Sequence, residues 1–463
     1  MSQAVNAGAT RCCIVGGGPA GMMLGLLLAR AGVPVTVLEK HGDFLRDFRG
    51  DTVHPSTLAI LDEIGLRERF DKLPQRRVDH LAGIVAGREQ QLVDFRGLKP
   101  YDYLALVPQW DFLDMLADAG RKLPAFDLRM RHAATGLIEE NGRTLGVRVK
   151  SPDGDYDLRT DLVVACDGRH STLREAAGFT AREYGAPMDV LWFRMPRSES
   201  DPQDTFGIVD RGHMMVLLNR DNDRPGGCRS DHASQGWDAR GSSGTLDPSK
   251  QSPGVYRARR VEAGQDDPSS TEGYWQVAFL VPKGSDAALR ARSIDALRET
   301  VAQLAPFLAD RKDAIEAWDK VSTLEVQVDR LERWHKPGLL LIGDAAHAMS
   351  PIGGVGINLA IQDAVAAANA LAQPLLGSDD IDESLLASIQ QRREWPVKVV
   401  QRVQILMQKQ LISRVLEEAG KPPRLPWPMR FLLGFRAVRH IPARLFGYGL
   451  RQEHVHTPAA GKV

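Results

Sequence analysis

Residues 12–23 read Cys12-Cys13-Ile14-Val15-Gly16-Gly17-Gly18-Pro19-Ala20-Gly21-Met22-Met23. A short apolar run, typical of a buried strand, meets three glycines and continues into an alanine- and leucine-rich segment, typical of a helix. Gly16, Gly18 and Gly21 have the spacing of a dinucleotide-binding turn. The first glycine permits the tight turn, the second lets the backbone approach a pyrophosphate, and the third lets the helix pack closely on the strand.

A second apolar run, residues 33–39, predicts a buried strand that ends in the carboxylate of Glu39. Glu39 follows the glycines by about 20 residues, the distance at which an acid binds a ribose hydroxyl in such folds. Strand, helix, strand and acid in this order predict a dinucleotide site. The alternative is a glycine-rich turn in an ordinary βαβ unit.

Composition narrows the class of protein. The 463 residues suffice for two to three domains, and 59 basic and 59 acidic residues leave no net charge to attract nucleic acid. Cysteines 12, 13, 166 and 228 lack zinc-site spacing, so we expect reduced thiols and no metal. We expect neither a secretory signal nor a membrane-spanning helix. These features predict a soluble, cytoplasmic protein; oligomeric state stays open.

Apolar spacing and turn residues divide the first half of the chain. We expect a helix over 54–65 that ends at Gly65, a β-hairpin over 81–95, a helix over 109–117, an antiparallel strand meander over 126–165, a buried strand over 162–168, a helix opening near Ser171, and strands over 184–219. Residues 221–273 hold few apolar residues and predict a disordered insertion; a functional lid is the alternative.

The second half is predicted to be mainly helical. We expect a helix over 294–304, a buried strand over 338–344, an apolar helix over 356–376 and a long charged helix over 383–418. Residues 426–450 combine basic and apolar side chains. We favour helices that fold back over the first domain, and a contact with a membrane surface is the alternative.

Three predicted buried strands end in chemically similar residues: Gly16, Asp167-Gly168 and Gly343-Asp344. Ligands bind at the carboxyl ends of parallel strands, so the three ends could converge on one extended cofactor. Together, the stretches 16–21, 166–174 and 343–351 resemble the class A flavoprotein monooxygenases, the family of para-hydroxybenzoate and phenol hydroxylases. The likeness extends in order from about residue 10 to 375.

The resemblance implies an α/β fold in three parts. A Rossmann-type FAD-binding domain with a parallel sheet would take residues 1–181 and 331–376. A β-rich substrate domain would take 182–330, and a helical region would take 377–463. FAD would be the bound dinucleotide, NADH or NADPH the reductant and O₂ the co-substrate.

The resemblance also implies cofactor-binding positions. Expected at the pyrophosphate and adenosine ribose are Gly16, Gly18, Pro19, Ala20, Gly21, Glu39, Lys40 and Arg49, the last also docking the nicotinamide unless it is merely a solvated arginine. Expected along the rest of FAD are Gln109, Asp167, Gly168, Gly343 and Asp344. For Asp344 the alternative is a helix cap.

The stretch 351–358 carries most of the implied mechanism. Expected to pass close to the isoalloxazine ring are Pro351, Gly354, Val355, Gly356, Ile357 and Asn358. The helix from Gly356 would direct its positive end at the flavin N1/O2 edge. Many relatives have glutamine where this chain has Val355, so only the backbone part of that contact carries over.

No side chain is assigned as catalytic. His54 and Pro351 are weak candidates; a cap or polar turn role suits His54 at least as well, and His347 is better explained as a packed residue than as a base. The implied activity is hydroxylation of an aromatic or other electron-rich small molecule through a C4a-hydroperoxyflavin. The substrate pocket is expected between the flavin and strands from 182–219 and 274–281, lined by apolar side chains.

Two other functions stay open. A halogenase or reductase could share this fold, although the W-x-W-x-I-P stretch of tryptophan-type halogenases is missing from the sequence. A flavin-binding accessory protein without turnover is the other alternative.

Overall fold

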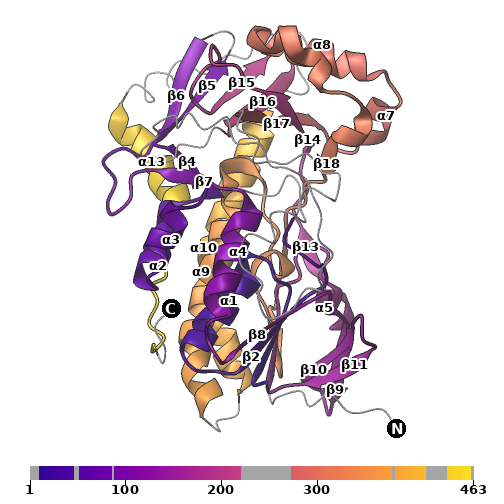
Figure 1. The fold of residues 1–463 in the computed structure, drawn as a ribbon, viewed down its shortest axis with the longest axis vertical. Helices are drawn as coiled ribbons and strands as arrows, with labels where there is room; N and C mark the ends of the chain where they lie inside the picture. Colours follow the sequence, from indigo (N-terminus) through magenta and orange to yellow (C-terminus); the bar gives the residue numbers. More distant parts are fainter. Residues whose placement is uncertain are drawn as a thin grey trace, which may run out of the picture.

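The computed structural model describes residues 10–45, 52–85, 88–220, 273–377, 381–412, 415 and 435–459. A seven-stranded sheet lies at one end of the molecule and a six-stranded sheet lies toward the other (Figure 1). The long helices α9 (Gly356–Leu376) and α10 (Glu383–Met407) run side by side next to the six-stranded sheet. α9 has the bounds predicted from sequence. α10 begins where predicted and continues into a π-helical turn at Gln408–Ile412, and most of the predicted remainder to residue 418 lies outside the described residues.

The six-stranded sheet confirms the predicted Rossmann-type arrangement. Its order is β20-β21-β12-β1-β2-β8, and only the β20–β21 pair is antiparallel. The strands are β1 (Cys12–Val15), β2 (Val35–Glu39), β8 (Phe126–Met130), β12 (Leu162–Ala165), β20 (His335–Lys336) and β21 (Leu339–Leu341). β1, β2, β12 and β21 are buried along their whole lengths, as expected of strands covered on both faces.

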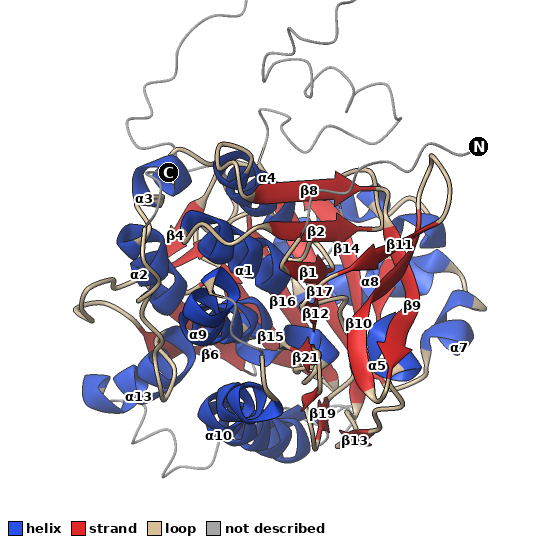
Figure 2. Cartoon of the chain, turned by 90° about the horizontal axis from the view of Figure 1, so that it is seen from below, coloured by secondary structure: helices blue, strands red, loops and turns tan. Residues whose placement is uncertain are grey.

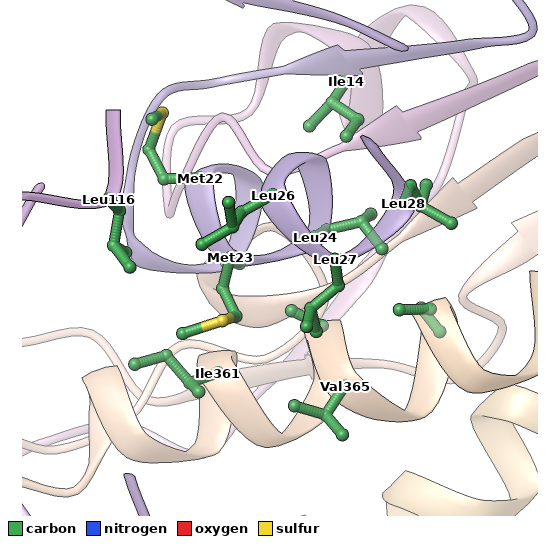
Figure 3. Close-up of a cluster of buried hydrophobic side chains, with 14 of the residues drawn as sticks. Ile14, Met22, Met23, Leu24, Leu26, Leu27, Leu28, Leu116, Ile361 and Val365 are labelled. Atoms are coloured by element: carbon green, nitrogen blue, oxygen red, sulfur yellow. The ribbon is translucent and has the colours of Figure 1, made fainter. Parts of the chain in front are cut away.

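One face of this sheet is covered by α1 (Pro19–Arg30), α4 (Gln109–Gly120) and α9 (Figure 2). Met23 and Leu27 of α1 point toward Ile361 and Val365 of α9 in the apolar cluster between the two helices (Figure 3). All four side chains are fully buried. Because α1 is apolar on every side, it can pack on both the sheet and α9.

The opposite face packs against a small antiparallel sheet, β11-β10-β9. Its strands are β9 (Ala133–Glu140), β10 (Arg143–Lys150) and β11 (Tyr156–Arg159). The meander predicted over 126–165 is therefore correct for these three strands, whereas β8 and β12 at its ends join the parallel sheet. Helix α5 (Thr172–Ala176) follows β12, as predicted.

The seven-stranded sheet has the order β18-β14-β17-β16-β15-β5-β6. Its strands are β5 (His80–Val85), β6 (Arg88–Asp94), β14 (Met188–Pro196), β15 (Phe206–Asp210), β16 (His213–Asn219), β17 (Tyr274–Pro282) and β18 (Ser322–Leu324). The hairpin β5–β6 confirms the prediction for 81–95, but its parallel pairing with β15 adds residues 80–94 to the sheet formed mainly by 182–330.

Helix α8 (Ile294–Leu304) covers one face of the seven-stranded sheet and has the bounds predicted from sequence. Shorter elements connect the layers. They are α2 (Pro55–Glu63), α3 (Arg67–Asp71), α7 (Asp286–Arg290), the 3-10 helices Pro306–Ala314 and Trp318–Lys320, the sheet β3-β7-β4 (Thr52–Val53, Leu104–Leu106, Arg76–Val78) and the pair β13–β19 (Ala181–Glu183, Asp329–Leu331).

Near the C-terminus, α13 (Arg436–Gly447) folds back over β6 (Figure 1). The Tyr448 hydroxyl after it exchanges hydrogen bonds with the backbone N–H and carbonyl of Tyr101, at 2.8 and 2.5 Å. Residues 435–450 thus fold back as predicted, but α13 packs on a strand of the seven-stranded sheet, and contacts such as those to Tyr101 and His54 join this segment to other parts of residues 1–181. Residues 426–434 lie outside the described residues, and a membrane-surface contact stays a prediction. The insertion 221–272 lies outside the described residues.

In the part of the chain that the structure describes, one helical stretch, Ile352–Leu376, is long and apolar enough to cross a membrane by those two criteria alone. It contains α9, and 78% of its most apolar window is buried inside the fold. The position of α9 between α1 and α10 accounts for its apolar composition.

Candidate cofactor site

The three strand ends singled out in the sequence meet at one edge of the parallel sheet. β12 pairs in parallel with β1 on one side and with β21 on the other, with Ala165 opposite both Val15 and Leu341. Gly16, Asp167 and Gly343 therefore follow three adjacent strands. The predicted convergence is confirmed.

Glycine suits each of the three positions in the first turn for a different local reason. Gly16 has φ +106°, and a Cβ there would lie 2.4 Å from the Cys166 carbonyl oxygen. A Cβ on Gly21 would lie 2.0 Å from the Gly16 oxygen, so α1 can approach β1 only with glycine here. A Cβ on Gly18 would meet nothing within 4 Å. The space beside Gly18 is open, as a cradle for a pyrophosphate requires.

Glu39 supports the glycine turn from the end of β2. Its Oε2 accepts a hydrogen bond from the Gly17 backbone N–H at 2.9 Å, and its Oε1 accepts one from the His41 N–H at 3.0 Å. The side chain is almost fully buried. The carboxylate thus holds the turn in shape, while its predicted contact with ribose, and that of the exposed neighbour Lys40, stay predictions.

The Asp167 carboxylate points toward the start of helix α5, which follows it in the chain. Oδ1 accepts from the Ser171 hydroxyl at 2.5 Å and Oδ2 from the Leu173 N–H at 3.2 Å. Burial raises the pKa of this carboxyl. Gly168 has φ +86° and an open side, so the backbone after β12 is accessible where the carboxylate is not.

Asp344 links two strand ends. Its carboxylate lies 3.5 Å from the guanidinium of Arg169, which follows β12. The Asp344 side chain is about one-third exposed, so this ion pair lies at the solvent-facing edge of the site. A Cβ on the preceding Gly343 would lie 3.3 Å from both the Ala20 and the Ala360 methyl groups, so the first turns of α1 and α9 meet there.

Both of these helix starts lack a side-chain cap. Neither Gly18 before α1 nor Val355 before α9 provides a capping hydrogen bond. The first backbone N–H groups of a helix have no partner within the helix, and the helix dipole favours negative charge beside them. The two starts therefore present N–H donors near Gly343, where a pyrophosphate and an anionic flavin edge can use them.

The loop between β21 and α9 is held against residue 52. Gly353 and Gly354 have φ +78° and +60°, and a Cβ on Gly354 would lie 2.2 Å from the Thr52 Oγ1. The Thr52 hydroxyl donates to the Gly354 carbonyl at 2.8 Å. Asn358 Oδ1 accepts from the Thr57 hydroxyl at 2.7 Å. The side-chain amide of Asn358 is therefore bonded to other residues of the protein. The predicted contact of Asn358 with the cofactor would have to be made by its backbone.

His54 is buried beside this loop. Its backbone N–H donates to Asn358 Oδ1 at 2.9 Å. Its Nδ1 lies 2.7 Å from the carbonyl oxygen of Phe446, near the end of α13. Burial lowers the pKa of His54 to about 4, so the ring is neutral near pH 7. The side chain makes no capping bond to α2, so the cap role considered from sequence is wrong for the imidazole.

Two charged residues and a histidine form a buried cluster behind Gly343. Asp363 of α9 accepts from the Gly343 N–H at 3.1 Å, lies 2.6 Å from His347 Nε2 and accepts from Arg393 Nε of α10 at 2.9 Å. Burial alone raises the pKa of the Asp363 carboxyl, but His347 and Arg393 bring it below its ordinary value. His347 is thus a packed, hydrogen-bonded residue, as the favoured interpretation held.

The remaining predicted positions are distributed around this edge. Gln109 is the first residue of α4, and Pro351 lies at the start of the loop, both half-buried. Arg49 lies outside the described residues. The sequence reasoning missed Asp363, Arg393 and Thr52. A signal for Asp363 was available, because a lone acid inside the apolar run 356–376 needs a buried partner.

A model of the FAD binding domain family matches residues 9–403, most of the chain. The chain belongs to this family, and it is a class A FAD-dependent monooxygenase. It is 30% identical to 6-methylpretetramide 4-monooxygenase of Streptomyces rimosus over 433 residues, which cover 93% of this chain and 91% of the relative. It is 25% identical to kynurenine 3-monooxygenase of Stenotrophomonas maltophilia, with 92% and 87% covered.

Solved structures share the fold at low identity. PqsL of Pseudomonas aeruginosa, a probable FAD-dependent monooxygenase, has a TM-score of 0.67 at 18% identity, with 89% of this chain and 99% of PqsL covered. The flavin-dependent brominase Bmp2 has a TM-score of 0.68 at 15% identity, with 96% and 94% covered. The fold alone therefore does not choose between hydroxylation and halogenation.

Proposed function

We propose that this monooxygenase takes electrons from NADH or NADPH, uses O₂, and hydroxylates a phenol or related activated aromatic compound in the cytoplasm. The observation that carries the proposal is the match to 6-methylpretetramide 4-monooxygenase along nearly the full length of both chains. The name of that relative makes fused-ring phenols the first substrates to test. The chain spans only 60% of a second relative from Streptomyces rimosus, 12-dehydrotetracycline 5-monooxygenase/anhydrotetracycline 6-monooxygenase.

The open edge described above fits FAD, which when bound supplies the redox and oxygen-activating chemistry. The uncapped starts of α1 and α9 and the open side of Gly18 support a pyrophosphate and flavin along this edge. Residues proposed to contact FAD are Gly16, Gly18, Pro19, Ala20, Gly21, Glu39, Lys40, Arg49, Gln109, Asp167, Gly168, Gly343, Asp344, Pro351, Gly354, Val355, Gly356, Ile357 and Asn358. Because burial lowers the pKa of His54 to about 4, its imidazole is a weak base, which favours a positioning role for that residue.

The substrate is proposed to bind between the cofactor loop and the seven-stranded sheet. Side chains alternate across this sheet: one set packs under α8, and the other turns toward Ile352 of the loop. Trp192, Met214 and Val216 of the second set are only partly buried, and their apolar surface suits an aromatic guest. This keeps 182–330 as the proposed substrate domain, with β5 and β6 added.

A separate cavity of about 20 Å³ lies between α9, α10 and the segment after α13. Asn358, Gln362, Arg393 and Phe446 are among its lining residues. It has room for about one water molecule. It is therefore too small to be the aromatic substrate site.

The overall reaction tests the proposal. One NAD(P)H, one proton, one O₂ and an aromatic C–H give NAD(P)⁺, water and an aromatic C–OH. Purified protein with FAD, NADH or NADPH and ¹⁸O₂ is expected to place one labelled oxygen in the product of a phenolic substrate. NAD(P)H oxidation that yields only unaltered phenol in a broad substrate screen would contradict hydroxylation.

Halogenation is the reaction to exclude, because the brominase Bmp2 shares this fold. The same assay with added bromide separates the two. A brominated product without ¹⁸O would support the halogenase, whereas a labelled hydroxyl with or without bromide would support the hydroxylase.

A further inference from the structure

Three glutamines of the C-terminal half of α10 and its π turn share one buried face. Gln401, Gln404 and Gln408 are spaced by three and four residues, so their side chains lie in a row. Each is at most 1% exposed. A buried amide requires hydrogen-bond partners, and the partners show what this face contacts.

Gln401 is the first glutamine of the row and contacts the segment that precedes the loop. Its Nε2 donates to the Asp329 carbonyl at 2.8 Å and to the Ala348 carbonyl at 3.1 Å. Its Oε1 accepts from the Arg330 guanidinium at 2.6 Å. The amide thus joins the strand β19 to the chain that leaves β21.

Gln404 holds the two peptide groups around Pro351. Its Nε2 donates to the Ser350 carbonyl at 3.0 Å and to the Ile352 carbonyl at 2.8 Å. Gln408 Nε2 donates to the Ser350 hydroxyl at 2.8 Å, and the same oxygen accepts from the Ile352 N–H at 3.3 Å. Two amides therefore fix the turn at Pro351.

The loop needs such support because it is irregular. The left-handed Gly353 and Gly354 follow Pro351, and carbonyls 350 and 352 belong to no sheet ladder or long helix. The Ala348 carbonyl accepts from the Asp329 backbone N–H at 3.3 Å as well as from Gln401. Thr52 holds Gly354 on the opposite side through its hydroxyl. The loop is thus held between Thr52 and the glutamine row of α10.

We propose that Gln401, Gln404 and Gln408 are positioning residues for the cofactor loop, which set residues 348–352 so that Pro351–Asn358 can receive FAD. The inference rests on FAD binding by this family, not on the identity of the substrate. Gln404 has the central place because it bonds on both sides of Pro351.

The test is FAD titration of the full-length apoprotein, followed by flavin fluorescence, for wild type and Gln404→Met. Methionine keeps the length of the side chain but cannot donate, and it also removes Oε1, which has no partner among the described residues. We expect the Kd for FAD to rise at least tenfold. The control Gln391→Met, at an exposed position of the same helix, should leave Kd unchanged.

Thermal unfolding with and without FAD separates positioning from general stability. A variant that destabilises apo and FAD-bound protein equally leaves Kd unchanged, because ligand stabilisation depends on Kd alone at a given FAD concentration. Equal losses of Tm in both forms, with wild-type Kd, would overturn the proposal. We expect a greater loss of Tm in the FAD-bound form.

Gln408→Met serves if Gln404→Met does not fold, since it removes only the bond to the Ser350 hydroxyl; a rise in Kd of several-fold is expected. Unchanged Kd in this variant would also contradict the proposal. If wild type itself fails to bind FAD, the cofactor assignment fails rather than the role of the row. Hydroxylation is tested independently by ¹⁸O incorporation.

Discussion

α9 and α10 lie side by side and approach the same loop, but by different means. α9 begins without a side-chain cap and presents its backbone N–H groups, and its side chains are mostly apolar. α10 begins with a cap, in which Asp382 accepts from the Leu385 N–H at 2.9 Å, and contacts the loop with buried side-chain amides.

The difference separates the two tasks of the site. Backbone donors at a helix start tolerate many side chains and suit the cofactor itself. Side-chain amides are specific in length and direction and suit the support of an irregular loop. Four predictions test this division, in order of the expected size of the effect.

Asp363→Asn should give the largest loss, because Asp363 and Arg393 link α9 to α10. Removing the Asp363 charge takes from the buried Arg393 guanidinium its closer carboxylate, at 2.9 Å, and leaves Glu453 Oε1 at 3.4 Å. Loss of one partner of a buried ion pair typically costs about 3–5 kcal/mol, and we expect the lower end of this range because Glu453 remains. Urea unfolding of the single variants and of Asp363→Asn/Arg393→Met measures this. The double variant should lose less than the sum of the singles; additive losses would show that the link contributes little.

His54→Asn should change how stability depends on pH. The pKa of His54 is about 4 in the fold against an ordinary value of 6.5 for histidine, so between these pH values the unfolded chain binds a proton that the folded protein does not. Wild-type stability should fall as pH is lowered from 6.5 to 4, by up to about 3 kcal/mol for this group. Asparagine can still donate to the Phe446 carbonyl but does not titrate.

The measurement is unfolding free energy at several pH values. The slope over this range should be shallower in His54→Asn, whereas His456→Asn, at an exposed histidine, should keep the wild-type slope. Parallel curves for wild type and His54→Asn would show that the ring is not held neutral next to α9.

Gly18→Val tests the uncapped start of α1, the counterpart of that of α9. The new side chain would enter open space and meet no protein atom within 4 Å at its Cβ. We expect an unchanged Tm of the apoprotein and a Kd for FAD raised about 100-fold, or about 2.7 kcal/mol. Gly136→Val, also open but on β9 away from the edge, is the control. Wild-type FAD affinity in Gly18→Val would place the pyrophosphate elsewhere.

Leu406→Ala should give the smallest effect. Leu406 is 58% exposed on the outer face of α10, whereas the three glutamines of the row are buried against the loop. The unfolding free energy should change by no more than about 0.5 kcal/mol, and FAD affinity not at all. A larger loss would indicate that the outer face of α10 is covered by a further contact.

Most of the cofactor edge could be predicted from local sequence. Gly16, Gly18 and Gly21 follow from the spacing that a strand–turn–helix connection to a dinucleotide requires. The structure gives Gly16 and Gly21 a steric reason each and leaves open space beside Gly18. The boundaries of α8 and α9 follow from apolar periodicity, a Ser293 cap and the glycine before the apolar run. Such signals are contained within a few neighbouring residues.

The supporting contacts could not be predicted in the same way. Gln401, Gln404 and Gln408 are separated from the loop by about fifty residues, and in sequence they resemble the solvated side of a charged helix. The pairing of β5 with β15 joins segments more than 120 residues apart, and His54 bonds to Phe446 at a sequence separation of 392.

The sequence alone determined which backbone turns can accept a dinucleotide, because glycine spacing and apolar periodicity act over one or two turns of chain. Only the tertiary structure decided what holds those turns in place. A buried amide or carboxylate must find a partner, but which distant carbonyl or guanidinium it meets depends on how the sheets and helices pack together.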